Sequence, residues 1–246
     1  YEGTEDKTLV AEFVEKDYPI MTRFYVTDLN QQNRYLGSVS YTAGDNTETL
    51  FTCATQEELP FTEYKKLHTP QVEGAVIDKT ENPIRLEEGV ENFSMNFKQY
   101  NEDITYNNGY RDIVCEPEIV WSYQTLYIDW NNDKEFSGEN EIYAAVGNNS
   151  GDNTFDDPDG NVTEGWDRTI TVPAETAPGT YRMRVVYMGP DPWSNDWPSK
   201  VFTEFYNEIR NGIAYDFEIA ISPASRIEGI ASGKVYYDAH AGLLIS

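Results

Sequence analysis

The chain has 246 residues, of which 43 are acidic and 18 are basic, so its formal net charge is −25. This charge argues against nucleic acid as a partner, because binding to phosphates requires a basic surface, and acidic membranes are equally poor partners. No stretch of the sequence approaches the roughly 18 consecutive apolar residues of a membrane-spanning helix. The length is sufficient for one large β-domain or two smaller ones with a proper core.

Short hydrophobic runs rich in Val, Ile, Tyr, Phe and Thr recur along the chain, which contains 18 Tyr and 5 Trp. Residues of these types fit the pleated, half-buried surface of a β-sheet. We therefore predict an all-β protein, an antiparallel β-sandwich of the jelly-roll-like or immunoglobulin-like kind, with a small N-terminal β segment.

The N-terminal segment, residues 1–70, is expected to form a small antiparallel sheet of its own. Its hydrophobic runs have the spacing of hairpins and are separated by polar turns such as residues 44–46. An irregular stretch over residues 60–70 marks the expected boundary. Strands are expected over residues 9–14, 20–27, 34–41 and 49–53.

Residues 71–222 are expected to form the main sandwich, followed by a C-terminal β tail over residues 223–246 that could begin a further domain. Strands are expected over residues 72–77, 84–86, 93–97, 119–130, 169–172 and 181–187. Alternation in the last strand places Arg182 and Arg184 on one face. In so acidic a chain, we expect both arginines to meet carboxylates.

The expected strand ending near Trp130 leads directly into an acidic loop that has an oxygen-bearing side chain at every second position. Calcium takes six to eight oxygen ligands, and a short loop of this kind can gather them. We predict a calcium site formed by Asp129, Asn131, Asp133, the carbonyl of Glu135, and a carboxylate of Glu139 or Glu141. The alternative is a solvated turn whose side chains hydrogen-bond their own backbone. The loop is not an EF-hand, because Lys134 stands where that motif has glycine.

A second candidate site is the loop over residues 189–198, which sets two tryptophans among Pro, Asp and Asn. Sugar sites need exposed aromatic faces with carboxylates or amides nearby to bind hydroxyl groups. The predicted ligand-binding residues are Trp193, Trp197, Asp191, Asn195 and Asp196. The alternative is that one or both tryptophans fold back and plug the end of the sandwich.

Cysteine and histidine are scarce. Cys53 and Cys115 permit one disulfide, and the sequence leaves open whether they form it or remain single. Only His68 and His240 could act as a histidine base. A Ser-His-Asp or Cys-His catalytic apparatus is therefore not expected.

Three blocks of the sequence resemble the GEVED domain, over about residues 75–221. Residues 127–136 are similar to its Ile-Asp-Trp-Asn-x-Asp-Gly-x-Phe block, and residues 169–185 to the strand pair that follows. Residues 212–217 stand at its Gly-Glu-Val-Glu-Asp-Tyr block, where Gly212 and Asp216 are kept and Phe217 replaces Tyr. The resemblance implies an accessory β-sandwich module of secreted or cell-surface bacterial proteins, particularly of the Bacteroidetes, and it names no reaction.

We therefore predict a non-catalytic extracellular module that binds calcium and attaches to a glycan or another surface component, as in adhesion. It would be secreted or located at the cell surface, with its signal already removed. The alternative function is a glycoside hydrolase that uses a carboxylate pair held about 5 to 10 Å apart across a sugar cleft.

Overall fold

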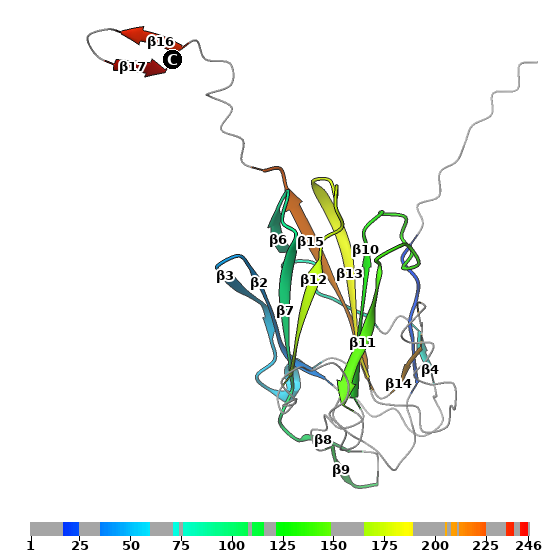
Figure 1. Cartoon of the computed structure of the whole chain (residues 1–246). Coiled ribbons are helices and arrows are strands. Elements are labelled where there is room, and N and C mark those ends of the chain that lie inside the picture. Colours follow the sequence, from blue (N-terminus) through cyan, green and yellow to red (C-terminus); the bar gives the residue numbers. More distant parts are fainter. Residues whose placement is uncertain are drawn as a thin grey trace, which may run out of the picture.

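The computed structural model describes residues 17–24, 35–59, 71–73, 76–107, 110–115, 122–148, 165–188, 205, 208–210, 212–224, 235–238 and 242–245. These residues are mostly strands, and two sheets pack face to face, which confirms the predicted all-β sandwich (Figure 1). The only helix in this part of the chain is one 3₁₀ turn, η1 (Gln56–Glu58). No helix within these ranges is long and apolar enough to cross a membrane.

The first sheet has six strands, and its long central members are antiparallel. The order is β11 (Ile142–Asn148), β10 (Ser122–Asp129), β13 (Gly179–Met188), β15 (Ile213–Ser222) and β5 (Val76–Asp78), and β6 (Ile84–Glu87) also pairs with β15. Both β5 and β6 run parallel to β15. The sheet is therefore mixed, whereas the sequence predicted antiparallel pairing.

The second sheet has four strands, in the order β12 (Gly165–Thr171), β7 (Asn92–Gln99), β2 (Leu36–Ala43) and β3 (Asn46–Thr52). β2 and β3 form the expected hairpin, whose turn begins at Gly44 with a φ of 59°. A left-handed φ of this kind suits glycine, which has no Cβ to clash. β2 also pairs with β7, so strands from both sides of the expected boundary near residue 70 belong to one sheet.

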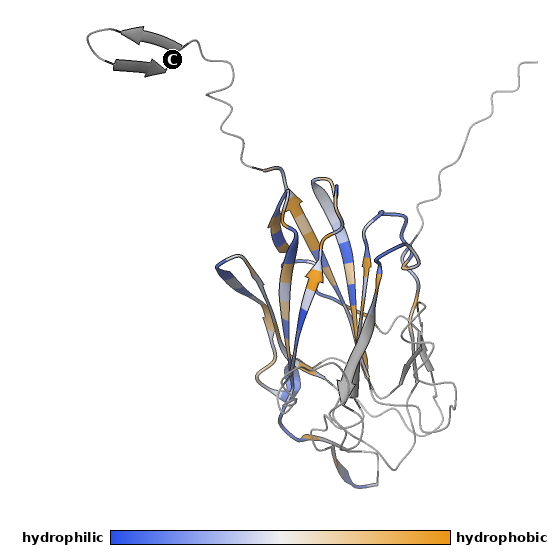
Figure 2. Ribbon diagram, viewed as in Figure 1, coloured by the Kyte–Doolittle hydropathy of each residue, from blue (hydrophilic) through white to orange (hydrophobic). Residues whose placement is uncertain are grey.

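The core lies between the two sheets and follows from strict alternation along the strands. Tyr181, Met183, Val185 and Tyr187 of β13 are buried in it, as are Phe93, Met95 and Phe97 of β7 from the other sheet. Hydrophobic residues lie along the strands, whereas the loop joining β10 to β11 is mostly hydrophilic (Figure 2). Val39 and Tyr41 of β2 are part of the same cluster, so residues 35–59 share its core.

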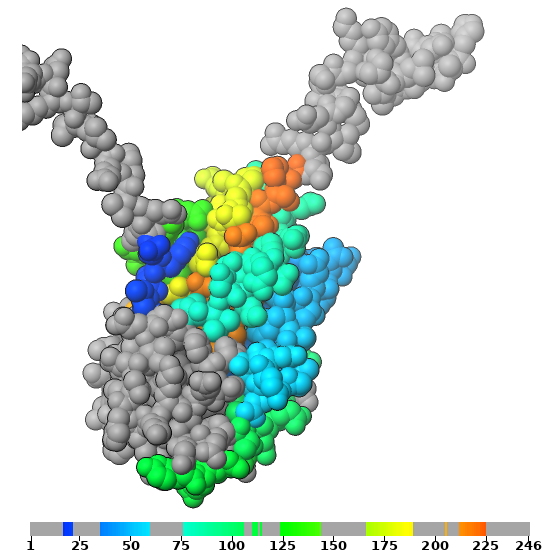
Figure 3. Space-filling view, turned by 180° about the vertical axis from the view of Figure 1, so that it is seen from behind, coloured from blue at the N-terminus to red at the C-terminus, as the bar shows by residue number. Residues whose placement is uncertain are grey.

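The N-terminal residues 17–21 cover the outer face of the first sheet. Figure 3 shows this dark-blue segment beside green residues of the β10–β11 region and yellow residues of β13. Met21 of this segment belongs to a second hydrophobic cluster, together with Tyr127, Phe136, Val186, Met188 and Ala214. The segment continues into β1 (Thr22–Phe24), which pairs with β14 (Glu208–Arg210) and β4 (Gln71–Glu73). Both faces of the first sheet are therefore buried near its centre.

Two short hairpins complete the described structure: β8 (Ile104–Asn107) with β9 (Asp112–Cys115), and β16 (Val235–Asp238) with β17 (Gly242–Ile245). The Cys53 thiol is free and partly buried, and burial raises its pKa. The side chain of Cys115 lies outside the described residues. The expected strand over residues 9–14 lies outside them as well.

Candidate functional site

The acidic loop after β10 is closed at its start by one buried carboxylate. Asp129, the last residue of β10, is fully buried. Its Oδ1 accepts a hydrogen bond from the backbone N–H of Asp133 (3.2 Å), and its Oδ2 accepts one from the N–H of Lys134 (3.0 Å). The Tyr18 hydroxyl, on the N-terminal segment, also donates to Oδ2 (2.8 Å). Asp129 thus joins the loop to a segment distant in sequence.

A second buried carboxylate, that of Glu141, closes the other end of the loop. Its oxygens accept hydrogen bonds from the backbone N–H groups of Asn131 (3.3 Å), Ser137 (3.1 Å) and Gly138 (2.6 Å). Burial raises the pKa of Glu141, while the hydrogen bonds from Gly138 and Asn131 oppose this shift. A Cβ on Gly138 would lie 2.5 Å from the Glu141 carboxyl carbon, so a larger residue there would displace this carboxylate from its present position.

Between these two carboxylates, hydrogen bonds from backbone N–H groups to nearby side-chain oxygens stabilise the turns of the loop. The Asn131 Oδ1 accepts from the N–H of Asp133, and the Asp133 Oδ1 accepts from the N–H of Glu135, each at 2.8 Å. Asn132 and Lys134 have left-handed φ values of 59° and 62°. The loop therefore has a left-handed residue at the position where an EF-hand has glycine, although a lysine occupies it. Hydrogen bonds of this kind are expected for the alternative interpretation of the loop, a solvated turn whose side chains bind their own backbone.

The predicted calcium ligands divide into two groups by exposure. Asp129 and Glu141 are buried, and Asn131, Asp133, Glu135 and Glu139 are exposed. Within the part of the chain that the structure describes, no group of three or more His, Cys, Asp or Glu side chains could hold a metal ion. Calcium binding at this loop remains a prediction.

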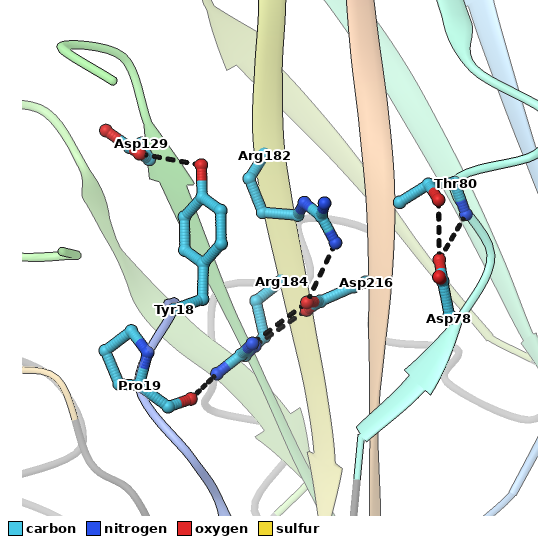
Figure 4. A network of polar contacts seen from close by, with 8 residues as sticks. All are labelled: Tyr18, Pro19, Asp78, Thr80, Asp129, Arg182, Arg184 and Asp216. Carbon is cyan, nitrogen blue, oxygen red and sulfur yellow. Dashed lines mark hydrogen bonds and ion pairs between the residues drawn. The ribbon is translucent and has the colours of Figure 1, made fainter. Parts of the chain in front are cut away.

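A row of polar side chains crosses the outer face of the first sheet next to the loop (Figure 4). Arg184 and Asp216 form a buried bidentate ion pair, with Nε–Oδ1 at 2.7 Å and Nη2–Oδ2 at 2.9 Å. Arg182 binds the same carboxylate, with Nη1–Oδ2 at 3.2 Å. The prediction that the two arginines share a face and meet carboxylates is confirmed, and a single aspartate serves both.

This row also holds the N-terminal segment in place. Arg184 Nη1 donates to the Pro19 carbonyl oxygen (2.5 Å), and the Arg182 guanidinium lies 5.0 Å from the centre of the Tyr18 ring. Burial raises the pKa of Tyr18, and its hydrogen bond to Asp129 adds to this shift. Tyr18 therefore remains a hydrogen-bond donor at physiological pH.

A pocket opens where the N-terminal segment, the acidic loop and the first sheet meet. Its volume is about 340 Å³, and its lining consists of Asp17, Tyr18, Asn132, Lys134, Thr180, Tyr181, Arg182 and Glu218. This pocket was not predicted from the sequence. Neither the alternation that places Arg182 on an outer face nor the composition of residues 17–18 indicates that these positions lie together.

The predicted ligand-binding residues after β13, namely Asp191, Trp193, Asn195, Asp196 and Trp197, lie outside the described residues. The structure brings together part of the predicted metal site, at Asp129, Asn131, Asp133 and Glu141. These four are linked through backbone N–H groups of the loop.

Comparison with protein families shows a GEVED domain at residues 123–219. This range spans β10 to β15 and includes the acidic loop, the Arg184–Asp216 pair and most of the pocket. Comparison with curated proteins gives no match, and neither does comparison with solved structures.

The structure gives physical reasons for the two residues kept in the third GEVED-like block. A Cβ on Gly212 would overlap the Tyr187 carbonyl oxygen and the Met188 Cα, so the close approach of β13 demands glycine there. Asp216 carries the buried ion pair. Ile213 and Tyr215, which stand at the glutamate positions of the block, are buried in the core. The acidic residues of that block are thus replaced here by core residues.

Proposed function

We propose that this chain is a non-catalytic, extracellular recognition module that binds a glycan or another surface component, with the GEVED domain as its scaffold. The extracellular location is supported by the GEVED resemblance. The non-catalytic assignment rests on one observation, which is that the buried carboxylates are occupied by hydrogen bonds within the protein. Asp129, Glu141 and Asp216 each accept several hydrogen bonds from the protein itself. A glycosidase needs two carboxylates that face a sugar across a cleft, so these three, which are bound by the protein itself, do not serve that chemistry.

The test of this function is a glycan array probed with the purified chain, followed by incubation of each retained glycan with the protein in solution. We expect retention of a subset of glycans and no shortening of any of them by mass spectrometry. Release of shorter saccharides would instead support the hydrolase alternative. Retention of no glycan would remove the glycan part of the proposal.

The tryptophan loop supplies a second part of the proposal, in which Trp193 or Trp197 stacks on the bound ligand. A loop holding three prolines, Pro190, Pro192 and Pro198, is stiffened and loses little entropy on binding. Trp193→Ala or Trp197→Ala is expected to weaken glycan binding about tenfold or more, since stacking and burial contribute about 1 to 3 kcal/mol. Both variants should keep the melting temperature of the parent chain. A drop of several degrees with unchanged binding would identify the tryptophans as core plugs.

Calcium binding at the acidic loop is the third part of the proposal. A metal that binds only the folded state stabilises it by about 2.7 kcal/mol at a hundred times its dissociation constant. The melting temperature should therefore fall in EDTA and recover when calcium is restored. Asp133→Asn removes an exposed carboxylate of the loop and should abolish the dependence of the melting temperature on calcium. The control Asp45→Asn, in the β2–β3 turn, should leave this dependence unchanged. An unchanged melting temperature, after elemental analysis shows no residual metal, would refute the site.

A further inference from the structure

We infer that the pocket formed by residues 17–18, the acidic loop and strands β13 and β15 binds a neutral, polyhydroxylated ligand, about one or two sugar rings in size. The inference deepens the proposed glycan recognition and rests on it. It assigns binding to a place in the fold that lies outside the tryptophan loop. The volume of about 340 Å³ lies at the lower end of the range for ligand sites, about 300 to 1,000 Å³, which sets the size of the ligand.

The charges around the pocket favour a neutral ligand. Two carboxylates, those of Asp17 and Glu218, stand among the lining residues with the cations of Lys134 and Arg182. The formal charges of the lining therefore balance. An anionic ligand would meet Asp17 and Glu218, and a cationic ligand would meet Lys134 and Arg182.

The mixture of hydrogen-bonding groups suits hydroxyl groups in particular. A hydroxyl donates one hydrogen bond and accepts others, so it is best bound where donors and acceptors alternate. The lining offers acceptors at Asp17 and Glu218, donors at Lys134 and Arg182, and groups of both kinds at Asn132 and Thr180. A ligand that carries several hydroxyl groups can therefore pair with many of these groups at once.

The walls of the pocket are held in position before any ligand arrives. The Tyr181 hydroxyl donates to the Ala177 carbonyl oxygen (2.6 Å), and its ring lies 5.4 Å from that of Trp130. Tyr18 is fixed by its hydrogen bond to Asp129 and by Arg182. A preformed site loses little conformational entropy on binding. Asp17 and Tyr18 precede the matched range 123–219, so the GEVED domain needs the N-terminal segment to complete this pocket.

The test uses ¹H–¹⁵N NMR titration and calorimetry of the full chain with methyl glycosides of neutral hexoses, neutral disaccharides, glucuronic acid and glucosamine. We expect saturable binding of at least one neutral sugar, with shifts centred on the amides of residues 132–134, 180–182 and 218. Glucuronic acid and glucosamine should bind more weakly. Glu218→Gln and Thr180→Val should each weaken the binding of the neutral sugar about tenfold, as expected for loss of a hydrogen bond to a ligand hydroxyl.

The matched controls are Glu87→Gln on β6 and Thr171→Val on β12, which are exposed strand residues outside the pocket lining. They should bind as the parent chain does, and all four variants should keep its melting temperature. Glycan binding that survives both pocket variants would overturn the pocket assignment and leave the proposed function standing. Binding at the pocket followed by cleavage of the sugar would support the pocket assignment and overturn the proposed non-catalytic function. Preference for a charged sugar, or no saturable binding of any neutral sugar, would overturn the inference.

Discussion

Asp216→Ala is expected to lower the free energy of unfolding by about 3 to 5 kcal/mol, because it leaves the buried Arg184 guanidinium without its counter-charge. Only 3% of the Arg184 side chain and 8% of the Asp216 side chain are exposed, so solvent cannot replace the lost partner. The change also frees Arg182, which binds the same carboxylate. Chemical denaturation of the variant and the parent chain measures the difference.

Glu87→Ala is the control for this prediction, since Glu87 is an exposed residue on the neighbouring strand β6, and a surface change of this kind costs at most about 0.5 kcal/mol. Replacing both partners, in Arg184→Met with Asp216→Leu, should restore part of the lost stability, because an apolar pair of similar volume needs no desolvation of charge. A loss for Asp216→Ala no larger than that of the control would show that the buried pair contributes nothing.

Gly212→Ala is expected to cost about 3 kcal/mol, at the upper end of the usual cost of overpacking. The added methyl group would overlap the Tyr187 carbonyl oxygen and the Met188 Cα of the neighbouring strand β13. Backbone atoms cannot rotate away as a flexible side chain can. The chain at Gly212 would therefore have to move away from β13. Thermal and chemical unfolding of the variant would measure this cost.

The control is Gly179→Ala, at the start of β13, where the nearest heavy atom to an added Cβ is the Tyr181 hydroxyl oxygen at 3.8 Å. This is an ordinary contact distance, so the control should change stability by no more than about 0.5 kcal/mol. Equal costs for the two substitutions would mean that alanine is disfavoured at both positions for a reason other than close strand approach.

Local pattern was enough to predict several of the strands and the direction in which their side chains point, but β11 and the central strand β15 were not among the strands predicted. Alternation in residues 181–187 placed Arg182 and Arg184 on one face, and the structure places them there, both bound to Asp216. The polar residues at 44–46 predicted the turn between β2 and β3. These features depend on the twofold period of a strand and on turn chemistry, which act between residues close in sequence.

Pairing between distant segments was decided only by the tertiary structure. Tyr18 reaches Asp129 across 111 positions, and Arg184 reaches the Pro19 carbonyl across 165. With 43 acidic residues in the chain, composition could not single out Asp216 as the partner of both arginines. The parallel addition of β5 and β6 to β15, and the sharing of one core by residues 35–59, depend on the path of the chain through space.

The sequence by itself therefore determined an all-β sandwich, the GEVED-like blocks and the position of the acidic loop. The tertiary structure decided that the N-terminal segment covers the outer face of the first sheet and completes the pocket with Asp17 and Tyr18. The physical reason is that side-chain period specifies which face of a strand is buried, but not which remote segment buries it. That choice depends on the sum of many contacts across the fold.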